Sequence, residues 1–352
     1  MKAAVEPIVR RVVVRAPNWL GDTVLALPAM AALRMHFASA SLTVAAPAAV
    51  AALFREDTGV RPDAVLVLPP SPRDAVVALR EGAFDLGILL PNSFRSAWAL
   101  RRAGIPQRWG IARSARGWLL TRRSVRAASG PHHSDYYRGV VRGLGIPCDD
   151  RAPALVASTG SLAAAATLLS RAGVLPDAPL VGVAPGAAYG QAKQWPPERM
   201  AAVMAQLVRG HGVTCVVVGA AHDRPSLRAI ESWLRSHAPE TQSRVLDLVG
   251  RTDLGSLVGV ASRCRVFVSN DSGAMHVAAA LGRPVIAIFG PTDERATRPL
   301  GHSTVLTADV FCRPCHLRDC PIDHRCMKRI DVETVVAAVS QHLDRPDKGG
   351  GQ

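Results

Sequence analysis

Short apolar runs alternate with helical patterns along almost the whole chain. Runs typical of buried strands lie at 12–15, 42–45, 64–68 and 86–90, and again at 180–184, 214–218, 245–248, 266–269, 285–289 and 304–307. Between them, apolar residues recur at helical spacing over 22–36, 72–80, 198–209, 227–237, 254–262 and 273–281. Strands joined through helices pair in parallel and bury both faces of their sheet. The alternation therefore predicts an α/β protein with parallel sheets covered on both sides.

The two groups of strands predict two domains. A span rich in Pro and Ala, residues 147–179, separates them. We expect two doubly wound, Rossmann-like domains over 1–165 and 166–330, a C-terminal helix within 331–345, and a flexible tail over 346–352. Because ligands bind beyond the carboxyl ends of the strands in such sheets, the loops that follow strands are the places to look for a site.

One loop of the second domain predicts a phosphate site. Residues 266–290 (VFVSNDSGAMHVAAALGRPVIAIFG) indicate a strand, a turn with Asp271, Ser272 and Gly273, a helix with His276, and another strand. A turn of this kind leaves backbone N–H groups and the positive end of a helix dipole free for an anion. Asp and Ser are also the commonest helix caps, and this segment alone leaves that alternative open.

A second loop of the same domain carries a lysine. Residues 181–200 (VGVAPGAAYGQAKQWPPERM) indicate a strand, a glycine-rich loop with Gly186 and Lys193, and a helix opened by two prolines. Lys193 is placed to reach an anionic ligand as a point charge. The spacing fits neither a Walker motif nor a dinucleotide-binding glycine motif, so kinase-like and dinucleotide-dependent functions are disfavoured.

Asp22 is the acidic candidate of the first domain. In residues 11–30 (RVVVRAPNWLGDTVLALPAM), a buried strand leads into a loop and then into a helix with Asp22 in its first turn. An acid in a first turn is usually only a complement to the helix dipole.

Taken together, these segments resemble glycosyltransferase family 9, the ADP-heptose:lipopolysaccharide heptosyltransferases. The resemblance is carried by residues 16–22 (APNWLGD), 91–96 (PNSFRS), 110–113 (GIAR) with 117–123 (GWLLTRR), and 184–190 (APGAAYG). It runs from about residue 10 to 345 and points in particular to the heptosyltransferase II branch. It implies the GT-B fold, in which two Rossmann-like domains face a cleft. The first would bind the acceptor and the second ADP-heptose, with the C-terminal helix packing back toward the first domain.

The resemblance also implies a mechanism. Heptose would pass with inversion from ADP-L-glycero-D-manno-heptose to the heptose of the lipopolysaccharide inner core, with heptosyl-Kdo2-lipid A as acceptor. Asp22 would be the catalytic base, and Lys193 would stabilise the diphosphate together with the helix N-terminus, without a metal or another cofactor. The donor site that it implies comprises Lys193, Asp271, Ser272, Gly273, His276 and Gly186, with His222 and Asp223 as weaker candidates.

Two alternatives stay open. The chain could be a heptosyltransferase I or III that uses a different inner-core acceptor. It could also be a catalytically inactive GT-B module that binds glycan or membrane. The second alternative is disfavoured, because a pure binding module would not need an acid such as Asp22 facing a phosphate site.

The charge pattern predicts an anionic partner. The formal net charge is +14, and no Asp or Glu occurs between Leu86 and Ser134, where arginine stands at 95, 101, 102, 108, 113, 116, 122, 123 and 126. A genome that favours Arg over Lys would explain part of that count but not the missing acids. No nucleic-acid-binding motif accompanies these arginines, so a membrane leaflet with phosphorylated glycolipid fits better. We assign acceptor or membrane contacts to Asn92, Arg95, Arg113, Arg116, Arg122 and Arg123.

Two absences bear on location. No apolar run reaches the roughly 18 residues that cross a bilayer, and the first strand and helix leave no room for a signal-peptide core. We therefore expect a cytoplasmic protein, peripheral on the cytoplasmic face of the inner membrane.

Four of the seven cysteines lie in one short stretch. Cys312, Cys315, Cys320 and Cys326 have C-x2-C-x4-C-x5-C spacing, which could enclose zinc or an iron–sulfur cluster. Disulfides are disfavoured in a reducing cytosol. The second pair is spread more widely than in strong zinc motifs, so we expect no bound metal, and a structural one if any is present. The other three cysteines are of the kind that fills cores.

Overall fold

The computed structural model describes residues 9–125 and 130–344, and the chain forms two compact units, 1–154 and 155–352. The boundary therefore lies at Ala154 rather than at residue 165, and helix α6 (Thr159–Arg171) belongs to the second unit. The expected tail, 346–352, and Arg126 lie outside the described residues. Among the described residues, no helix has the length and apolar character needed to cross a membrane.

The first unit contains a six-stranded parallel sheet with the strand order β3-β2-β1-β4-β5-β6. The strands are β1 (Arg11–Arg15), β2 (Ser41–Pro47), β3 (Ala64–Leu68), β4 (Leu86–Leu89), β5 (Gln107–Ile111) and β6 (Arg122–Ser124). The helices are α1 (Leu20–His36), α2 (Ala48–Ala51), α3 (Pro72–Glu81), α4 (Phe94–Arg102) and α5 (His133–Arg142), with the 3-10 turns η1 (Ala52–Arg55) and η2 (Gly117–Leu119).

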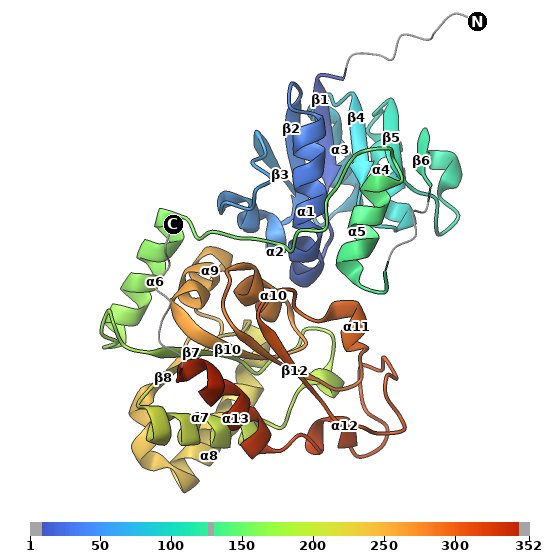
Figure 1. The fold of residues 1–352 in the computed structure, drawn as a ribbon. Helices are drawn as coiled ribbons and strands as arrows, with labels where there is room; N and C mark the ends of the chain where they lie inside the picture. The colour runs from blue at the N-terminus through green and yellow to red at the C-terminus, as the bar shows by residue number, and fades with distance from the viewer. Residues whose placement is uncertain (1–8, 126–129, 345–352) are drawn as a thin grey trace, which may run out of the picture. The chain divides into compact units, whose positions relative to one another are not determined.

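Helices cover both faces of this sheet. In β1 the residues Val12, Val13 and Val14 are fully buried, and Val13 packs in one core with Leu79 of α3 and Leu100 of α4. Successive side chains of a strand point to opposite faces, so Val12 and Val14 point to the face along which α1 and α5 lie side by side (Figure 1). A strand buried on both faces has to be apolar throughout, which is why β1 was recognisable in the sequence.

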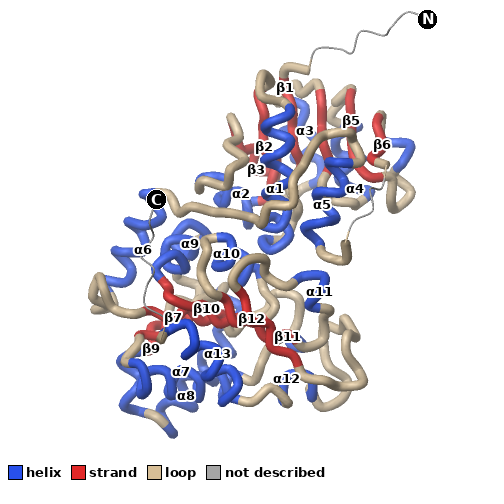
Figure 2. Tube along the Cα trace, viewed as in Figure 1, coloured by secondary structure: helices blue, strands red, loops and turns tan. Residues whose placement is uncertain are grey.

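The second unit repeats this architecture in the order β12-β11-β10-β7-β8-β9, with its strands in red in Figure 2. The strands are β7 (Leu180–Ala184), β8 (Thr214–Val217), β9 (Val245–Asp247), β10 (Cys264–Asn270), β11 (Val285–Phe289) and β12 (Ser303–Thr307). The helices after α6 are α7 (Pro197–His211), α8 (Arg224–His237), α9 (Leu254–Arg263), α10 (Gly273–Ala280), α11 (Glu294–Thr297), α12 (Arg325–Lys328) and α13 (Val332–Leu343), with the 3-10 turns η3 (Gln191–Lys193), η4 (Ala221–Asp223) and η5 (Pro239–Arg244).

Alternate residues of β7 pack into two separate hydrophobic cores, one on each face of the sheet. Val181 and Val183 pack with α7, α8 and α13, whereas Leu180 and Ala184 pack with α6, α9 and α10. Helix α13 begins and ends where the sequence predicted, but it is an integral part of the second unit, since its apolar face packs on α7, β10 and β11. The helix expected at 331–345 is thus a core helix of the second unit, and its packing toward the first domain stays a prediction.

Both sheets have the Rossmann strand order, and in both the order reverses at one place. The reversal lies between β1 and β4 in the first unit and between β7 and β10 in the second. The loops that leave the carboxyl ends of these paired strands diverge to opposite sides, which opens a crevice for ligands. In the first unit, the loop after β1 leads to Asp22 in the first turn of α1, and the loop after β4 leads through residues 91–93 into α4. In the second unit, the loop after β7 carries Gly186 to Lys193, and the loop after β10 leads through Asp271 and Ser272 into α10, which carries His276.

Candidate functional site

An ion pair joins the two loops at the reversal point of the second unit. The Nζ atom of Lys193 lies 2.5 Å from Oδ2 of Asp271, and the two side chains are only 11% and 6% exposed. Thr292 donates a hydrogen bond of 2.7 Å to the same oxygen. Lys193 also lies 4.7 Å from the centre of the Tyr189 ring. Asp271 and the Tyr189 ring thus fix the position of the Lys193 ammonium group, which is what the binding of a ligand by this group requires.

A buried amide fixes the two loops to each other. Asn270, the last residue of β10, is fully buried. Its Oδ1 atom accepts a hydrogen bond of 3.2 Å from the backbone N–H of Trp195, and its Nδ2 atom donates one of 2.6 Å to the carbonyl of Pro185. Trp195 is itself fully buried and donates its indole N–H to the carbonyl of Ile330. The loop that carries Lys193 is therefore anchored at both of its ends.

Two glycines in this loop are required by close contacts. A Cβ atom at position 186 would collide with the carboxylate of Asp223, and one at position 190 would collide with the carbonyl of Arg318. Gly190 also has a φ of 158°, which disfavours other residues. The Asp223 side chain is buried, its Oδ2 atom accepts a hydrogen bond from the N–H of Ala220, and its Oδ1 atom lies 3.6 Å from Nε2 of His222.

The N-terminus of α10 lies next to this ion pair in the sequence and is the expected phosphate site. Helix α10 begins at Gly273, and its N-cap residue is Ser272, whose backbone is extended. Within the described residues, the Ser272 side chain makes no capping hydrogen bond to the first turn of α10, and its Oγ atom lies 3.0 Å from Oγ of Ser269 instead. The ordinary N-cap alternative is therefore not what the structure has. The first N–H groups of the helix remain without that side-chain partner, and His276, one turn further, is buried.

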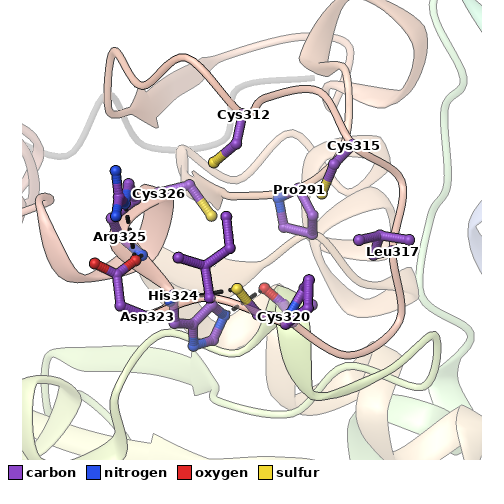
Figure 3. A pocket seen from close by; sticks show the side chains of 12 residues that line it. Pro291, Cys312, Cys315, Leu317, Cys320, Asp323, His324, Arg325 and Cys326 are labelled. Atoms are coloured by element: carbon purple, nitrogen blue, oxygen red, sulfur yellow. Dashed lines mark hydrogen bonds and ion pairs between the residues drawn. The ribbon is translucent and has the colours of Figure 1, made fainter.

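The four clustered cysteines surround one small cavity. Cys312, Cys315, Cys320 and Cys326 line a space of about 60 Å³, and Figure 3 shows their thiol groups turned toward it. All four are free thiols, and burial raises the pKa of Cys326. Across the described residues, however, no group of three or more His, Cys, Asp or Glu side chains is placed to hold a metal ion. The geometry shows four thiols around a cavity rather than a formed metal centre.

The loop that carries these cysteines supports the Lys193 loop. The backbone N–H of Ala192 donates to the carbonyl of Arg318 at 2.9 Å, and the carbonyl of Ala192 lies 2.6 Å from Nε2 of His324. The hydroxyl of Tyr189 donates to the carbonyl of His316 at 2.8 Å. The cysteine-rich loop therefore acts as a scaffold for the residue that immediately precedes Lys193.

In the first unit, Asp22 is paired with residues of helix α5. Its Oδ1 atom lies 3.3 Å from Nδ1 of His133, and its side chain is 28% exposed. Tyr137, one turn along α5 from His133, also hydrogen-bonds to Asp22. Burial and the negative charge of Asp22 raise the pKa of Tyr137, so its hydroxyl keeps its proton. Asp22 is thus more than a complement to the dipole of α1, since two side chains from another helix hold it.

A large cavity lies within the first unit. It has a volume of about 1010 Å³ and extends from the ends of β1, β2 and β3 to α3 and α4. Its walls combine apolar side chains such as Val76 and Leu79 with arginines, and the described residues that line it include no carboxylate. The arginines are Arg15, Arg73, Arg80, Arg95 and Arg102.

Arg15 is the most unusual of these arginines. Burial lowers its pKa to about 10, so it still carries its charge at neutral pH. Its hydrogen bonds go to neutral acceptors, the side chain of Asn18 at 2.6 Å and the carbonyl of Ala16. A partly buried cation whose hydrogen bonds within the described residues go to neutral acceptors favours an anion nearby. The cavity therefore suits an amphipathic, negatively charged ligand.

The residues assigned to acceptor or membrane contacts fall into separate places. Arg95 lines the cavity, Asn92 is exposed beside Tyr136, and Arg113, Arg122 and Arg123 are exposed around β5, β6 and η2. The assignment of Arg116 is wrong. Its side chain is fully buried and donates to the carbonyls of Ile111, Pro91 and Ser93, so it connects the loops after β4 and β5.

Sequence reasoning missed several residues of these sites. Arg15, Arg73, Arg80 and Arg102 were not assigned to ligand binding, and His133 was not linked to Asp22. A charged residue at the end of a strand that is otherwise fully apolar, as Arg15 is, was a signal that could have been used. The contact of Asp22 with His133 joins residues 111 positions apart, and nothing in the sequence indicates it.

Comparison with known proteins gives concordant matches. The profile of glycosyltransferase family 9 (heptosyltransferase) matches residues 74–325. The chain is 32% identical to lipopolysaccharide heptosyltransferase 2 of Salmonella typhimurium, covering 83% of this chain and 86% of that protein, and 31% identical to the Escherichia coli protein of the same name at the same coverage. The structure of the E. coli ADP-heptose lipopolysaccharide heptosyltransferase II superposes with a TM-score of 0.80 at 28% identity, covering 95% of this chain and 98% of that one. The two six-stranded parallel sheets thus confirm the expected GT-B fold class.

Proposed function

Because this chain belongs to glycosyltransferase family 9, the heptosyltransferases, we propose that it moves heptose from ADP-L-glycero-D-manno-heptose to the heptose already present on the lipopolysaccharide inner core. This is the heptosyltransferase II reaction. The relatives that share about 30% identity over most of the chain carry that name. We further propose that the enzyme works at the cytoplasmic face of the inner membrane, where such an acceptor would be presented.

The main support for the proposal is the arrangement of the expected donor-binding residues in the second unit. The uncapped N-terminus of α10 and the buried Lys193 lie on the two loops that flank the reversal point of the second sheet. Backbone N–H groups of Gly273 and its neighbours would bind the diphosphate of ADP-heptose, and Lys193 would offset the negative charge that grows on it as the glycosidic bond breaks. Asp271 then has the role of orienting Lys193.

Asp22 supplies the proton acceptor in this proposal. A single displacement at the anomeric carbon needs a base that removes the proton of the attacking hydroxyl, and it inverts the anomeric configuration. Asp22 is partly exposed, so an acceptor hydroxyl can reach it, and His133 and Tyr137 hold its carboxylate in one orientation. These two side chains therefore position the base rather than react.

The arginine-lined cavity is the proposed acceptor site. Its arginines and apolar walls fit a ligand that has phosphate or carboxylate groups beside hydrocarbon, as the inner core attached to lipid A has. Arg15 and Asn18 line this cavity, and both lie a few residues before Asp22 in the sequence. The acceptor and the donor would thus be bound by charges from different units.

A panel of acceptors tests the proposal against its rivals. Purified enzyme is incubated with ADP-heptose and, separately, with Kdo2-lipid A, heptosyl-Kdo2-lipid A and a diheptosylated core, and products are detected by mass spectrometry. The proposal predicts addition of one heptose to heptosyl-Kdo2-lipid A only. Addition to Kdo2-lipid A would indicate a heptosyltransferase I, addition to the diheptosylated core a heptosyltransferase III, and no addition to any of them an inactive binding module.

A further inference from the structure

Three large aromatic side chains form one exposed cluster on the first unit. We call Phe94, Trp98 and Trp118 the aromatic patch. The ring centres of Phe94 and Trp98 lie 6.1 Å apart, and each of the two lies 6.3 Å from that of Trp118. The side chains are nevertheless 42%, 41% and 56% exposed. The three rings therefore contact one another without being covered by the core.

The patch is at the surface because neighbouring residues of the same elements are the ones that pack into the core. Helix α4 buries Ala97 and Leu100 against the sheet, whereas Phe94 and Trp98, four residues apart, share its outer face. Trp118 lies in η2, and the next residue of that turn, Leu119, is fully buried. Because contiguous apolar groups of this size are costly in water, an exposed cluster of aromatic rings marks a contact surface.

Arginines surround the patch. The guanidinium carbon of Arg101 lies 5.3 Å from the ring centre of Trp118, and that of Arg102 lies 5.9 Å from the ring of Trp98. Arg95 follows Phe94 directly and is exposed. The patch lies wholly within the stretch from Leu86 to Ser134, which contains no acidic residue. A partner of this surface therefore has to be negatively charged as well as able to accept aromatic rings.

The patch continues into the arginine-lined cavity. Trp98 belongs to both, since it lines the cavity while its ring contacts Trp118. Arg102, which lies over the Trp98 ring, also lines the cavity. A ligand bound in the cavity would thus leave it beside exposed aromatic rings. This continuity suits an amphipathic ligand that extends from the cavity to the protein surface.

We propose that the aromatic patch and its arginines are the membrane-docking surface of this protein, and that they insert into the headgroup layer of an anionic lipid bilayer. Trp and other rings with a polar edge prefer that layer, and Arg is attracted to its negative surface. The link to the acceptor cavity rests on the proposed function, but the docking surface itself does not.

Single-stranded nucleic acid is the other anionic partner that binds aromatic rings. Such proteins present rings on which successive bases stack. In the patch the Phe94 and Trp98 planes are inclined by only 18° and stack on each other, while Trp118 is inclined to them by 51° and 64°, so the three rings pack among themselves. The apolar cavity wall beside them also favours hydrocarbon over bases. These two observations favour the lipid surface.

The test compares the full chain with the double variant Phe94→Ala/Trp118→Ala. Neither residue lines the cavity, so the acceptor site is left intact. Co-sedimentation with vesicles of phosphatidylglycerol and phosphatidylcholine measures partitioning, and fluorescence quenching by brominated lipid reports insertion of Trp. We expect vesicle partitioning to fall by about tenfold for each ring removed, and quenching by brominated lipid to decrease with it.

Phe311→Ala is the matched control. Phe311 is 82% exposed, lies in the second unit, and also has an arginine over its ring, Arg325 at 5.0 Å. Its removal should leave partitioning unchanged. An equal loss in both variants, or no loss in the double variant, would overturn the proposal. So would binding of the wild type to poly(U) with no binding to the anionic vesicles.

A transfer assay separates this inference from the proposed function. With acceptor embedded in vesicles, the double variant should lose transfer in proportion to its lost partitioning. With deacylated, water-soluble acceptor, it should match the wild type within about twofold. Loss of transfer to both acceptors with retained vesicle binding would contradict the docking role. Absence of transfer in the wild type itself would contradict the proposed function and leave the vesicle result standing.

Discussion

Lys193 and Asp271, 78 residues apart, form an ion pair of 2.5 Å between two side chains that are almost completely buried. Each residue comes from a loop that follows a strand at the reversal point of the second sheet. Burying two charges costs much of what their attraction returns, so such a pair is weak evidence for a role in stability alone. Its position at the end of β7 and β10 points instead to a lysine kept in place for a ligand.

The pair nevertheless affects stability when only one partner is removed. Lys193→Met should lower the free energy of unfolding by about 3–5 kcal/mol, because it leaves the Asp271 carboxylate buried without its cation. The double variant Lys193→Met/Asp271→Leu should recover most of that loss. Urea unfolding of the four proteins in this cycle checks the coupling. Additive losses would mean that the two side chains do not interact in solution.

Lys193→Ala should weaken ADP-heptose binding and slow transfer together. A charge on the diphosphate acts in the ground state and the transition state, and a charge-assisted hydrogen bond of this kind contributes about 1.5–3 kcal/mol, roughly 10- to 100-fold. Calorimetry and steady-state kinetics measure the two effects. Lys328→Ala is the control, because Lys328 is an exposed lysine of the same unit. Unchanged donor affinity in Lys193→Ala would place this lysine outside the donor site.

Asp22→Asn should keep the fold and ADP affinity but lose about 10²- to 10⁴-fold in transfer, because it removes the base and preserves its shape. His133→Ala should cost less, about tenfold, since His133 only orients the carboxylate. In the Asp22→Asn background the His133 change should have no further effect, since two residues that act as a unit are not additive. Independent losses in the double variant would show that His133 acts without Asp22.

Arg73→Gln/Arg80→Gln should weaken acceptor binding and leave donor affinity unchanged. Both arginines are exposed at the cavity, and a basic group near an anionic surface contributes about 1 kcal/mol, roughly fivefold for each. The loss should be largest at low salt, where screening is weak. Arg228→Gln, an exposed arginine of α8, is the control. A fall in ADP-heptose affinity would assign the cavity to the donor instead.

Much of the fold could be predicted from the sequence because the central strands are buried on both faces. All ten strands expected from apolar runs are present, with bounds that differ by at most two residues. Strands β5 and β6 were missed. Strand β6 is the edge strand of the first sheet, with Arg122 and Arg123 exposed, and an edge strand needs no continuous apolar run. Strand β5 lies between β4 and β6, and Gln107 and Arg108 leave it without such a run.

The site was predicted in part for an equally physical reason. Loops that follow buried strands mark the carboxyl edge of a sheet, so local order alone places Asp22, Lys193 and Asp271 at that edge. The roles expected for them came from the family resemblance and stay predictions. Charge in a sequence does not reveal burial, so Arg116 was taken for a surface residue, although its side chain is fully buried and donates to three backbone carbonyls. The contacts of Asp22 with α5 and the cavity between α3 and α4 depend on tertiary packing and could not be predicted.

The most direct test of the central claim is an NMR analysis of the product that wild-type enzyme forms from ADP-heptose and heptosyl-Kdo2-lipid A. The account predicts a new heptose attached to the existing heptose, with an anomeric configuration opposite to that of the donor, as a single displacement assisted by Asp22 requires. Attachment to Kdo, retention of configuration, or no product would contradict it.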